Sequence, residues 1–231
     1  MKPFARLAIA SCICTLLLAG CGGDPAAPPQ SLATAGASKT SALTITAANY
    51  HPLIQRVYLA YFGRPADPAG LAFYAQKYLE AAAPPDVAAI TGAYNASAGV
   101  RALVDSFGLS QESRDLYPGD NKVFLAAIYR NLFNRTPDAA GEAFWVAALD
   151  AGAITRGSAA ISLMAGAQDD DRKLVDIKVK AASDFTAALN TPSRVAAYDG
   201  LSANAVVRQM LAGVTLATDP VSIPQAIEST I

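Results

Sequence analysis

The sequence is poor in the residues that enzymes most often use as bases. It has a single histidine, His51, in 231 residues, so any Ser/His/Asp or Cys/His apparatus would have to use that side chain. No Gly-x-Ser-x-Gly string is present to supply a nucleophile elbow. His51 stands before Pro52 at the predicted start of a helix, where a capping or solvent-exposed role accounts for it. No His-Glu-x-x-His string occurs either, which disfavours a zinc site.

Cysteine is equally scarce. The three cysteines are Cys12, Cys14 and Cys21, all within the first 21 residues. If the leader is removed before Cys21 and that thiol then carries lipid, as proposed below, no free cysteine remains. The mature chain would therefore have no disulfide framework, no thiolate nucleophile and no cysteine metal site.

Residues 1–20 have the composition of an export signal. Lys2 and Arg6 precede an apolar core of about 12 residues, which is too short to span a bilayer in the usual way. The string Leu18-Ala-Gly-Cys21 that ends this core resembles the lipobox of bacterial lipoproteins. The resemblance implies cleavage before Cys21, a diacylglyceryl group on its thiol, and an acyl chain such as palmitate on its amino group. The alternative is an ordinary secretory signal with an incidental cysteine.

Lipidation at Cys21 would hold the protein at a membrane. Two or three acyl chains exceed the two signals that stable anchoring needs. Gly22 and Gly23 follow Cys21, where Gram-negative lipoproteins that stay at the inner membrane often have aspartate. We therefore expect a lipid-anchored protein of the cell envelope, at the outer membrane if the host is Gram-negative.

Residues 21–47 are expected to form a flexible linker that begins with the lipidated cysteine. Gly, Ala, Pro, Ser and Thr dominate this segment, and too few bulky apolar side chains are present to offset the entropy of ordering it. A flexible chain of about 26 residues has an r.m.s. reach of roughly 25–30 Å. Loss of Lys2 and Arg6 with the signal leaves 16 basic residues against 19 acidic ones. That balance gives no electrostatic footprint for nucleic acid.

Long alternating runs of β-branched residues, which a sheet would need, are missing as well. Residues 48–231 are instead predicted to form an all-α domain of many helices. The predicted helices span residues 48–62, 68–81, 86–94, 97–107, 110–116, 120–133, 138–150, 155–166, 170–190 and 202–213. The dipeptide Thr191-Pro192 is taken as a break between helices. Near the end of the chain, Pro224 either starts a last short helix or lies in a frayed tail.

What the sequence does have is an internal duplication. The segment from Tyr58 to Tyr74 aligns without a gap with the segment from Tyr129 to Trp145, at an offset of 71 residues. The identical positions include Tyr58, Phe62, Arg64, Asp67, Gly70, Ala72 and Phe73, which match Tyr129, Phe133, Arg135, Asp138, Gly141, Ala143 and Phe144. Self-similarity of this kind predicts a domain built from a repeated helical unit, with repeats near 50–80 and 121–150.

The residue types at the middle of each repeat predict a helix–turn–helix corner. Gly63 and Asn134 suit the left-handed conformation that ends a helix. Asp67 and Asp138 are the predicted N-caps of the next helix, since a carboxylate can accept from its free amides.

Two further pairs complete the predicted corner. Gly70 and Gly141 fall in the first turn of the second helix, where glycine normally costs stability. We expect the crossing helix to come close enough there to block a Cβ. Arg64 and Arg135 stand three residues before each aspartate, and we expect them to clamp the turn or to cover the preceding carbonyls.

The string from Ile128 to Trp145 closely resembles a bacterial family known as domain of unknown function 4214. Segments 100–108, 165–168, 178–189, 211–215 and 219–222 resemble the flanking parts of that family, so the likeness covers most of residues 48–230. The resemblance implies a helical domain of exported and surface proteins, distantly similar to phycobilisome linker domains, with no established catalytic residues to transfer. Two departures are noted: Asp176 stands where the family often has asparagine, and Tyr74 replaces tryptophan in the first repeat.

The acidic string Asp169-Asp170-Asp171 is a weak calcium candidate, because carboxylates supply the oxygen ligands that calcium prefers. It lacks the alternating spacing and the glycine turn of an EF-hand loop. Carboxylates at the start of a helix are stabilised by its dipole without any ion. No cofactor and no other metal site is predicted.

Glycan recognition and glycan hydrolysis both remain open. Four carboxylates on predicted helix surfaces could supply the pair that a glycoside hydrolase needs: Glu112, Asp115, Glu142 and Asp150. Three aromatic side chains could instead form a glycan-binding face: Tyr94, Tyr117 and Trp145. Trp145 is more simply a core anchor of the duplicated unit, in the position that Tyr74 has in the first repeat.

These observations predict a lipid-anchored, all-helical envelope protein that acts as a non-enzymatic interaction or scaffold module. Acyl chains on Cys21 would fix its position, the linker would give it reach, and a rigid helical surface would bind protein or glycan. The alternative is a cell-envelope hydrolase with a carboxylate pair in a cleft between the repeats. A flat junction between the repeats, filled by Trp145 and Tyr74, would favour the interaction module.

Overall fold

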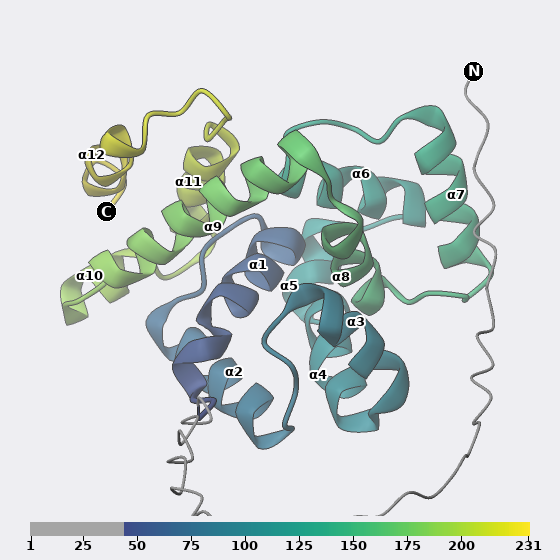
Figure 1. Cartoon of the computed structure of the whole chain (residues 1–231). Coiled ribbons are helices and arrows are strands. Elements are labelled where there is room, and N and C mark those ends of the chain that lie inside the picture. The colour runs from purple at the N-terminus through teal and green to yellow at the C-terminus, as the bar shows by residue number, and fades with distance from the viewer. Residues whose placement is uncertain (1–43) are drawn as a thin grey trace, which may run out of the picture. The chain divides into compact units, whose positions relative to one another are not determined.

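The computed structural model describes residues 44–231, and all regular structure in this part of the chain is helical. The predicted all-α fold is therefore confirmed (Figure 1). The predicted signal, the lipidation residue Cys21 and nearly all of the predicted linker lie outside the described residues. Among the helices of residues 44–231, none is both long and apolar enough to cross a bilayer.

The elements follow one another with short connections. In chain order they are η1 (Ala47–Tyr50), α1 (His51–Phe62), α2 (Pro68–Glu80), α3 (Val87–Ala96), α4 (Ala98–Gly108), α5 (Gln111–Leu116), α6 (Asn121–Phe133), α7 (Ala139–Asp150), α8 (Arg156–Gly166), α9 (Asp169–Ala188), α10 (Pro192–Ala197), α11 (Leu201–Ala212), η2 (Pro220–Ser222) and α12 (Ile223–Glu228).

The ten predicted helices are present, with ends that differ by a few residues. The first is split, because Pro52 has no amide to continue the α-helical ladder backwards, and the turn before it is the short 3-10 helix η1. The predicted break near Thr191-Pro192 is present, since α9 ends at Ala188, but the structure adds α10 between residues 190 and 202, where no helix was predicted. Thr191 in fact caps that helix by accepting from the Arg194 amide at 3.3 Å, with Pro192 as its first residue.

The helix ends at the repeated segment follow the predicted chemistry. Gly63 and Asn134 adopt left-handed conformations, with φ of 64° and 54°, at the ends of α1 and α6. Asp67 accepts from the Gly70 amide at 2.7 Å and caps α2, and Asp138 accepts from the Gly141 amide at 2.8 Å and caps α7. Both corners therefore stop one helix and start the next by the same means.

The duplication extends beyond the aligned segment. Shifted by 71 residues, the ranges of α1 to α4 overlap those of α6 to α9 in the same order. Asn131 donates from Nδ2 to the Ala60 carbonyl at 2.8 Å, and these two positions are themselves 71 residues apart. The two repeats meet through equivalent helices: α1 packs against its equivalent α6, and α3 packs against its equivalent α8.

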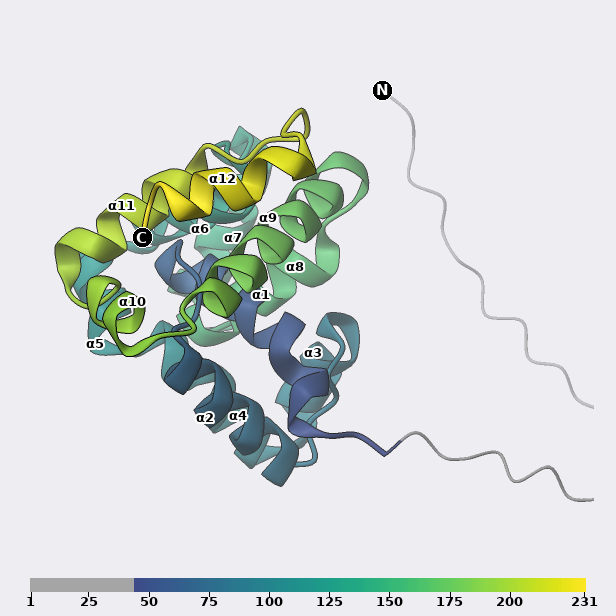
Figure 2. The same cartoon turned by 90° about the vertical axis from the view of Figure 1, so that its left-hand side faces the viewer.

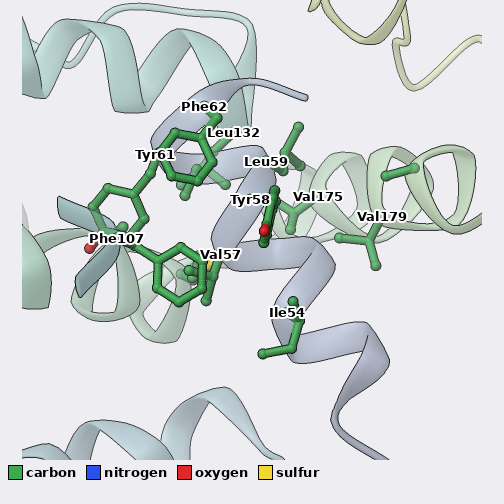
Figure 3. Packing of buried hydrophobic residues seen from close by; sticks show 14 of the residues in the cluster. Ile54, Val57, Tyr58, Leu59, Tyr61, Phe62, Phe107, Leu132, Val175 and Val179 are labelled. Atoms are coloured by element: carbon green, nitrogen blue, oxygen red, sulfur yellow. The ribbon is translucent and has the colours of Figure 1, made fainter. Parts of the chain in front are cut away.

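Helix α1 lies at the centre of the core. It packs against α2, α4, α6, α8 and α9, and nine of its twelve residues are buried. Figure 3 shows Val57, Tyr61 and Phe62 from α1 among Phe107, Leu132 and Val175 from three other helices. An α-helix covered on nearly every side has apolar residues on nearly every side, which is why this segment lacks a polar face.

The last third of the chain packs onto this body along α9. Helices α11 and α12 both contact α9 (Figure 2). Lys178 of α9 is 1% exposed and donates to the Asn131 carbonyl at 2.7 Å and to the Asn134 side chain. The amine of Lys178 thus reaches the C-terminal end of α6, where a cation can bind backbone carbonyls that the helix leaves without a partner. Burial lowers the pKa of Lys178 to about 8.

Candidate functional site

The two repeated segments, residues 58–74 and 129–145, are called corner 1 and corner 2. Corner 1 joins α1 to α2, and corner 2 joins α6 to α7. In corner 1 the Arg64 guanidinium binds Glu112 through two parallel bonds of 2.7 Å, from Nε and Nη2. Its third nitrogen, Nη1, donates to the Pro65 carbonyl at 3.1 Å. The arginine thus ties the turn to α5.

Corner 2 repeats this geometry with a different acid. Arg135 donates from Nε and Nη2 to the Asp171 carboxylate at 3.2 and 2.6 Å, and from Nη1 to the Thr136 carbonyl at 3.3 Å. The expectation that these arginines clamp the turn is met. The alternative, that they cover the preceding carbonyls, is wrong, because each one donates to the carbonyl that follows it.

Aromatic rings hold both guanidinium groups in place. Arg64 lies 5.3 Å from the ring centroid of Tyr58 and 5.4 Å from that of Phe62. The corresponding distances in corner 2, from Arg135 to the rings of Tyr129 and Phe133, are 5.3 and 5.7 Å. The two ring pairs meet edge to face at the same interplanar angle of 75°. Cation–π contact and bidentate pairing together leave each arginine little freedom.

The pKa values of the two arginines are raised. Burial by itself would lower the pKa of Arg64, but its hydrogen bonds and charge interactions with Glu112 and Tyr198 outweigh that cost. For Arg135 the hydrogen bond to Asp171 is the largest cause. Burial also raises the pKa of Tyr198 to about 12, so its hydroxyl stays protonated near neutral pH. Both corners therefore present a permanently cationic guanidinium.

The corners differ in what covers them. At corner 1 the Tyr198 hydroxyl donates to the Pro65 carbonyl at 2.6 Å and accepts from Arg64 Nη1 at 3.3 Å. Tyr198 directly follows α10, and Arg64 is only 9% exposed beneath it. At corner 2 the Arg135 side chain is 46% exposed, and Thr136 is exposed as well. Within residues 44–231, corner 2 has no counterpart of Tyr198 on its arginine.

A groove of about 660 Å³ lies beside corner 1. Its lining includes Arg64, Asp67, Leu189, Val195 and Tyr198. Asp67 already caps α2, and the three donor nitrogens of Arg64 are already bonded to Glu112, Pro65 and Tyr198. The groove thus lies against a corner whose polar groups are satisfied.

The two glycines that follow the caps are not equivalent. A Cβ on Gly70 would overlap the Tyr58 hydroxyl of α1 and come within 2.8 Å of Asp67 Oδ2. A Cβ on Gly141 would meet only its own capping residue, with Asp138 Oδ1 at 3.4 Å. The predicted close approach holds for Gly70, where a side chain of the crossing helix makes the contact. It is wrong for Gly141.

Each corner ends in an aromatic pair of which one ring is exposed. Phe73 and Tyr74 of α2 meet edge to face at 5.2 Å, and Phe144 and Trp145 of α7 do the same at 5.2 Å. Phe73 is 56% exposed and Phe144 65% exposed. Tyr74 and Trp145 are half-buried against the core. These two exposed pairs, Phe73–Tyr74 and Phe144–Trp145, are called the aromatic pairs.

The sequence predicted that Trp145 and Tyr74 are core anchors, but the exposure of Phe73 and Phe144 was not predicted. The missed signal was the identity of Phe73 and Phe144 in the alignment. Each stands one position before an inward-facing ring, and neighbouring residues of a helix point about 100° apart. A junction between the repeats filled by Trp145 and Tyr74, which would have favoured the interaction module, is not found in residues 44–231. Tyr74 packs on Phe107 at 4.2 Å, whereas the aromatic partner of Trp145 is Phe144 of its own corner.

The other candidate aromatic residues do not form a surface. Tyr94 is 8% exposed and its hydroxyl donates to Asp105 at 3.0 Å. Tyr117 is 9% exposed and its hydroxyl accepts from Asn131 at 2.7 Å. The predicted glycan-binding face that used these two tyrosines is therefore wrong, because both rings are packed inside.

The four candidate carboxylates are each engaged with a neighbour. Glu112 is held by Arg64, and Asp115 accepts from Gln111 at 2.7 Å. Glu142 pairs with Lys122 at 2.7 Å, and Asp150 accepts from Asn121 at 2.7 Å. The first two are on α5 and the last two on α7. These four side chains do not meet as a free pair in one cleft.

The acidic string 169–171 forms the first turn of α9. Asp171 is bound by Arg135, and Asp170 pairs with Lys173 at 3.2 Å. Among residues 44–231, no three His, Cys, Asp or Glu side chains are grouped as a metal site. His51 is half-buried at the first position of α1. The location of the string fits stabilisation by the helix dipole and by Arg135.

The fold and the two corners define a class: an all-helical domain with an internally duplicated helix–turn–helix corner. Residues 104–169 match the model of the family described as "Domain of unknown function (DUF4214)". The matched span begins within α4, ends at the first residue of α9, and contains all of corner 2. Searches of curated proteins and of solved structures found no match. The predicted likeness to this family is confirmed for that span, and its extension to corner 1 stays a prediction.

Proposed function

We propose that this chain is a lipid-anchored protein of the cell envelope, and that its helical domain is a non-enzymatic interaction or scaffold module for protein or glycan. One observation carries the binding role. The same exposed phenylalanine is presented twice, on α2 and α7, each time fixed by a half-buried neighbour. Exposed aromatic rings on rigid helices are the kind of contact that binding surfaces use.

The envelope address is proposed from the sequence. Cys21 follows a lipobox-like string, and acyl chains on it would hold the protein at the outer membrane of a Gram-negative host. The segment up to residue 47 would let the helical domain move roughly 25–30 Å from the anchor. A distant likeness to phycobilisome linker domains agrees with a scaffold role and belongs to the same proposal.

The hydrolase alternative receives no support from the candidate residues. Glu112 is neutralised by a bidentate arginine, and Glu142 pairs with an exposed lysine. A glycosidase needs one carboxyl group that can give up a proton and a second one across the scissile bond. None of the four candidates is placed for either role beside another.

Capture from an envelope extract tests the proposed function. The full chain would be used as bait, alongside a Phe73→Ala/Phe144→Ala variant that removes both exposed rings. We expect the variant to lose a protein or glycan that the wild-type chain retains. The matched control is Leu109→Ala/Leu201→Ala, because these leucines are 56% and 80% exposed but lie outside both aromatic pairs. Recovery of no partner, together with hydrolysis of a glycan panel, would reverse the proposal in favour of the enzyme.

A further inference from the structure

Corner 1 shows how a corner of this kind is covered. The Tyr198 hydroxyl sits between two groups, the Pro65 carbonyl to which it donates and the Arg64 Nη1 from which it accepts. Its ring centroid lies 5.8 Å from the guanidinium carbon. A phenol suits this position because one hydroxyl serves as donor and acceptor at once, while the ring covers the cation.

Corner 2 carries the same receiving groups in the same arrangement. Arg135 Nη1 lies 3.3 Å from the Thr136 carbonyl, compared with 3.1 Å between Arg64 Nη1 and the Pro65 carbonyl. Asp171 holds the other two nitrogens of Arg135 as Glu112 holds those of Arg64. The guanidinium is therefore fixed before any partner arrives, which lowers the entropy cost of binding. In the described part of the chain, residues 44–231, only the phenol is absent from corner 2, and the Arg135 side chain is 46% exposed where Arg64 is covered.

None of the tyrosines of this chain covers Arg135 in the described residues 44–231 as Tyr198 covers Arg64. The sequence has nine, and none of them lies in residues 1–43. Tyr129 takes at corner 2 the place that Tyr58 takes at corner 1. Tyr198 is occupied at corner 1. A second copy of the chain has its own Tyr198 engaged in the same way, so the phenol for corner 2 has to come from a different protein.

We propose that corner 2 is a docking site for a partner protein that presents a tyrosine at the end of a short helical turn, as α10 presents Tyr198 to corner 1. The partner hydroxyl donates to the Thr136 carbonyl and accepts from Arg135 Nη1. This inference rests on the proposed interaction function and names one class of partner for it. Corner 1 is the internal template for the contact.

The chain itself supplies both the probe and the reporter. A synthetic peptide of residues 189–200 contains α10 and a single tyrosine, and a second peptide with Tyr198→Phe lacks only the hydroxyl. The one tryptophan, Trp145, belongs to corner 2 and packs edge to face on Phe144 there. Its fluorescence reports binding at corner 2 and not at corner 1. The titration uses the full chain purified in detergent.

We expect the tyrosine peptide to change the Trp145 emission and the phenylalanine peptide to bind about tenfold more weakly, because a hydrogen bond to a charged group is lost. Arg135→Gln should weaken binding of the tyrosine peptide by about tenfold and abolish the difference in affinity between the two peptides. Arg130→Gln, which removes an exposed arginine of α6, is the matched control and should change neither affinity. Circular dichroism of each variant checks that the helices are intact.

Three results would overturn the proposal. One is equal binding of the two peptides, and another is unchanged binding to Arg135→Gln. The third is no response to either peptide up to concentrations on the order of 1 mM, or a response to soluble glycan fragments in its place. If the Phe73→Ala/Phe144→Ala variant loses its envelope partner while Arg135→Gln retains it, the proposed function stands and this inference fails.

Discussion

At the level of single residues, identical positions in the two repeats have come to serve different purposes. Gly70 and Gly141 both follow a capping aspartate by three residues. Only Gly70 faces a side chain of the neighbouring helix, the Tyr58 hydroxyl. An alignment records the identity but not the neighbour, so sequence reasoning assigned both glycines the same role.

Substitution by alanine should separate these two glycines. Gly70→Ala should destabilise the chain by about 1–3 kcal/mol, because the added methyl group overlaps the Tyr58 hydroxyl. Gly141→Ala should be neutral or stabilising by up to about 1 kcal/mol, because alanine favours the helix and meets no close neighbour. Adding Tyr58→Phe to Gly70→Ala should recover most of the loss. Urea unfolding of the full chain measures all three, and equal effects at the two glycines would contradict the geometry.

The buried amine of Lys178 predicts how the stability of the chain depends on pH. Its pKa is lowered from 10.5 to about 8 by burial, so the folded chain binds this proton less tightly than the unfolded chain does. Between pH 8 and 10.5 the unfolded chain therefore holds more protons, and this residue makes stability rise with pH in that window. The gain is at most about 3 kcal/mol.

The measurement compares the wild-type chain with Lys178→Met, which has no proton to lose at that position. The unfolding free energy of the wild type, relative to that of Lys178→Met, should increase as the pH rises from 8 to 10. Buried tyrosines act in both proteins alike and cancel in the difference. Parallel pH profiles would show that the buried amine does not titrate in this range.

At the level of elements, the crossing of α4 and α8 depends on two glycines. A Cβ on Gly157 would lie 2.6 Å from the Asp105 Cα, and one on Gly108 would lie 2.7 Å from the Gly157 nitrogen. The Tyr61 hydroxyl of α1 donates to the Gly157 carbonyl at the same place. A Cβ on Gly157 would also overlap the Asp105 carboxylate, which could turn aside, but the two backbone contacts leave nothing flexible to move.

Gly157→Ala should therefore cost at least about 2 kcal/mol, in the range of overpacked cores. Gly92→Ala is the matched control, because a Cβ there meets nothing within 4 Å and α3 should gain about 0.5–1 kcal/mol. Thermal unfolding followed by circular dichroism distinguishes the two outcomes. A small effect at Gly157 would mean that the two helices can move apart at little cost.

Sequence patterns predicted most helices, because caps, breakers and apolar spacing are local properties. The predicted N-caps Asp67 and Asp138 and the helix ends at Gly63 and Asn134 are all found. Helix α10 was missed because Thr191-Pro192 begins a helix as readily as it ends one. These patterns did not reveal that the third and fourth helices belong to each repeat, since their side chains differ and only their spacing in the chain is kept.

The candidate site was less predictable than the fold. Each arginine's acid, Glu112 for corner 1 and Asp171 for corner 2, comes from a distant part of the chain, and the two are not equivalent in the repeat. Which corner is covered depends on where α10 packs, and that is a tertiary property. The prediction that Tyr94 and Tyr117 lie on the surface was wrong for the same reason. An amphipathic ring can be buried or exposed, depending on the residues that pack around it.

For the whole molecule, the proposed anchor makes the simplest prediction. Cys21→Ser should abolish incorporation of labelled palmitate and move the protein from the membrane fraction to the soluble fraction, because the acyl chains have no other attachment point. Cys14→Ser is the control, since that residue would leave with the signal. Membrane association that survives Cys21→Ser would contradict lipid anchoring at this residue.

The bond from Asn131 to the Ala60 carbonyl has a consequence for how the domain holds together. Helix α1 is covered by α6, α8 and α9, all from the second repeat. A protease cut in the connector between α5 and α6 would thus not release two folded halves, since each half would expose its central helix on departure.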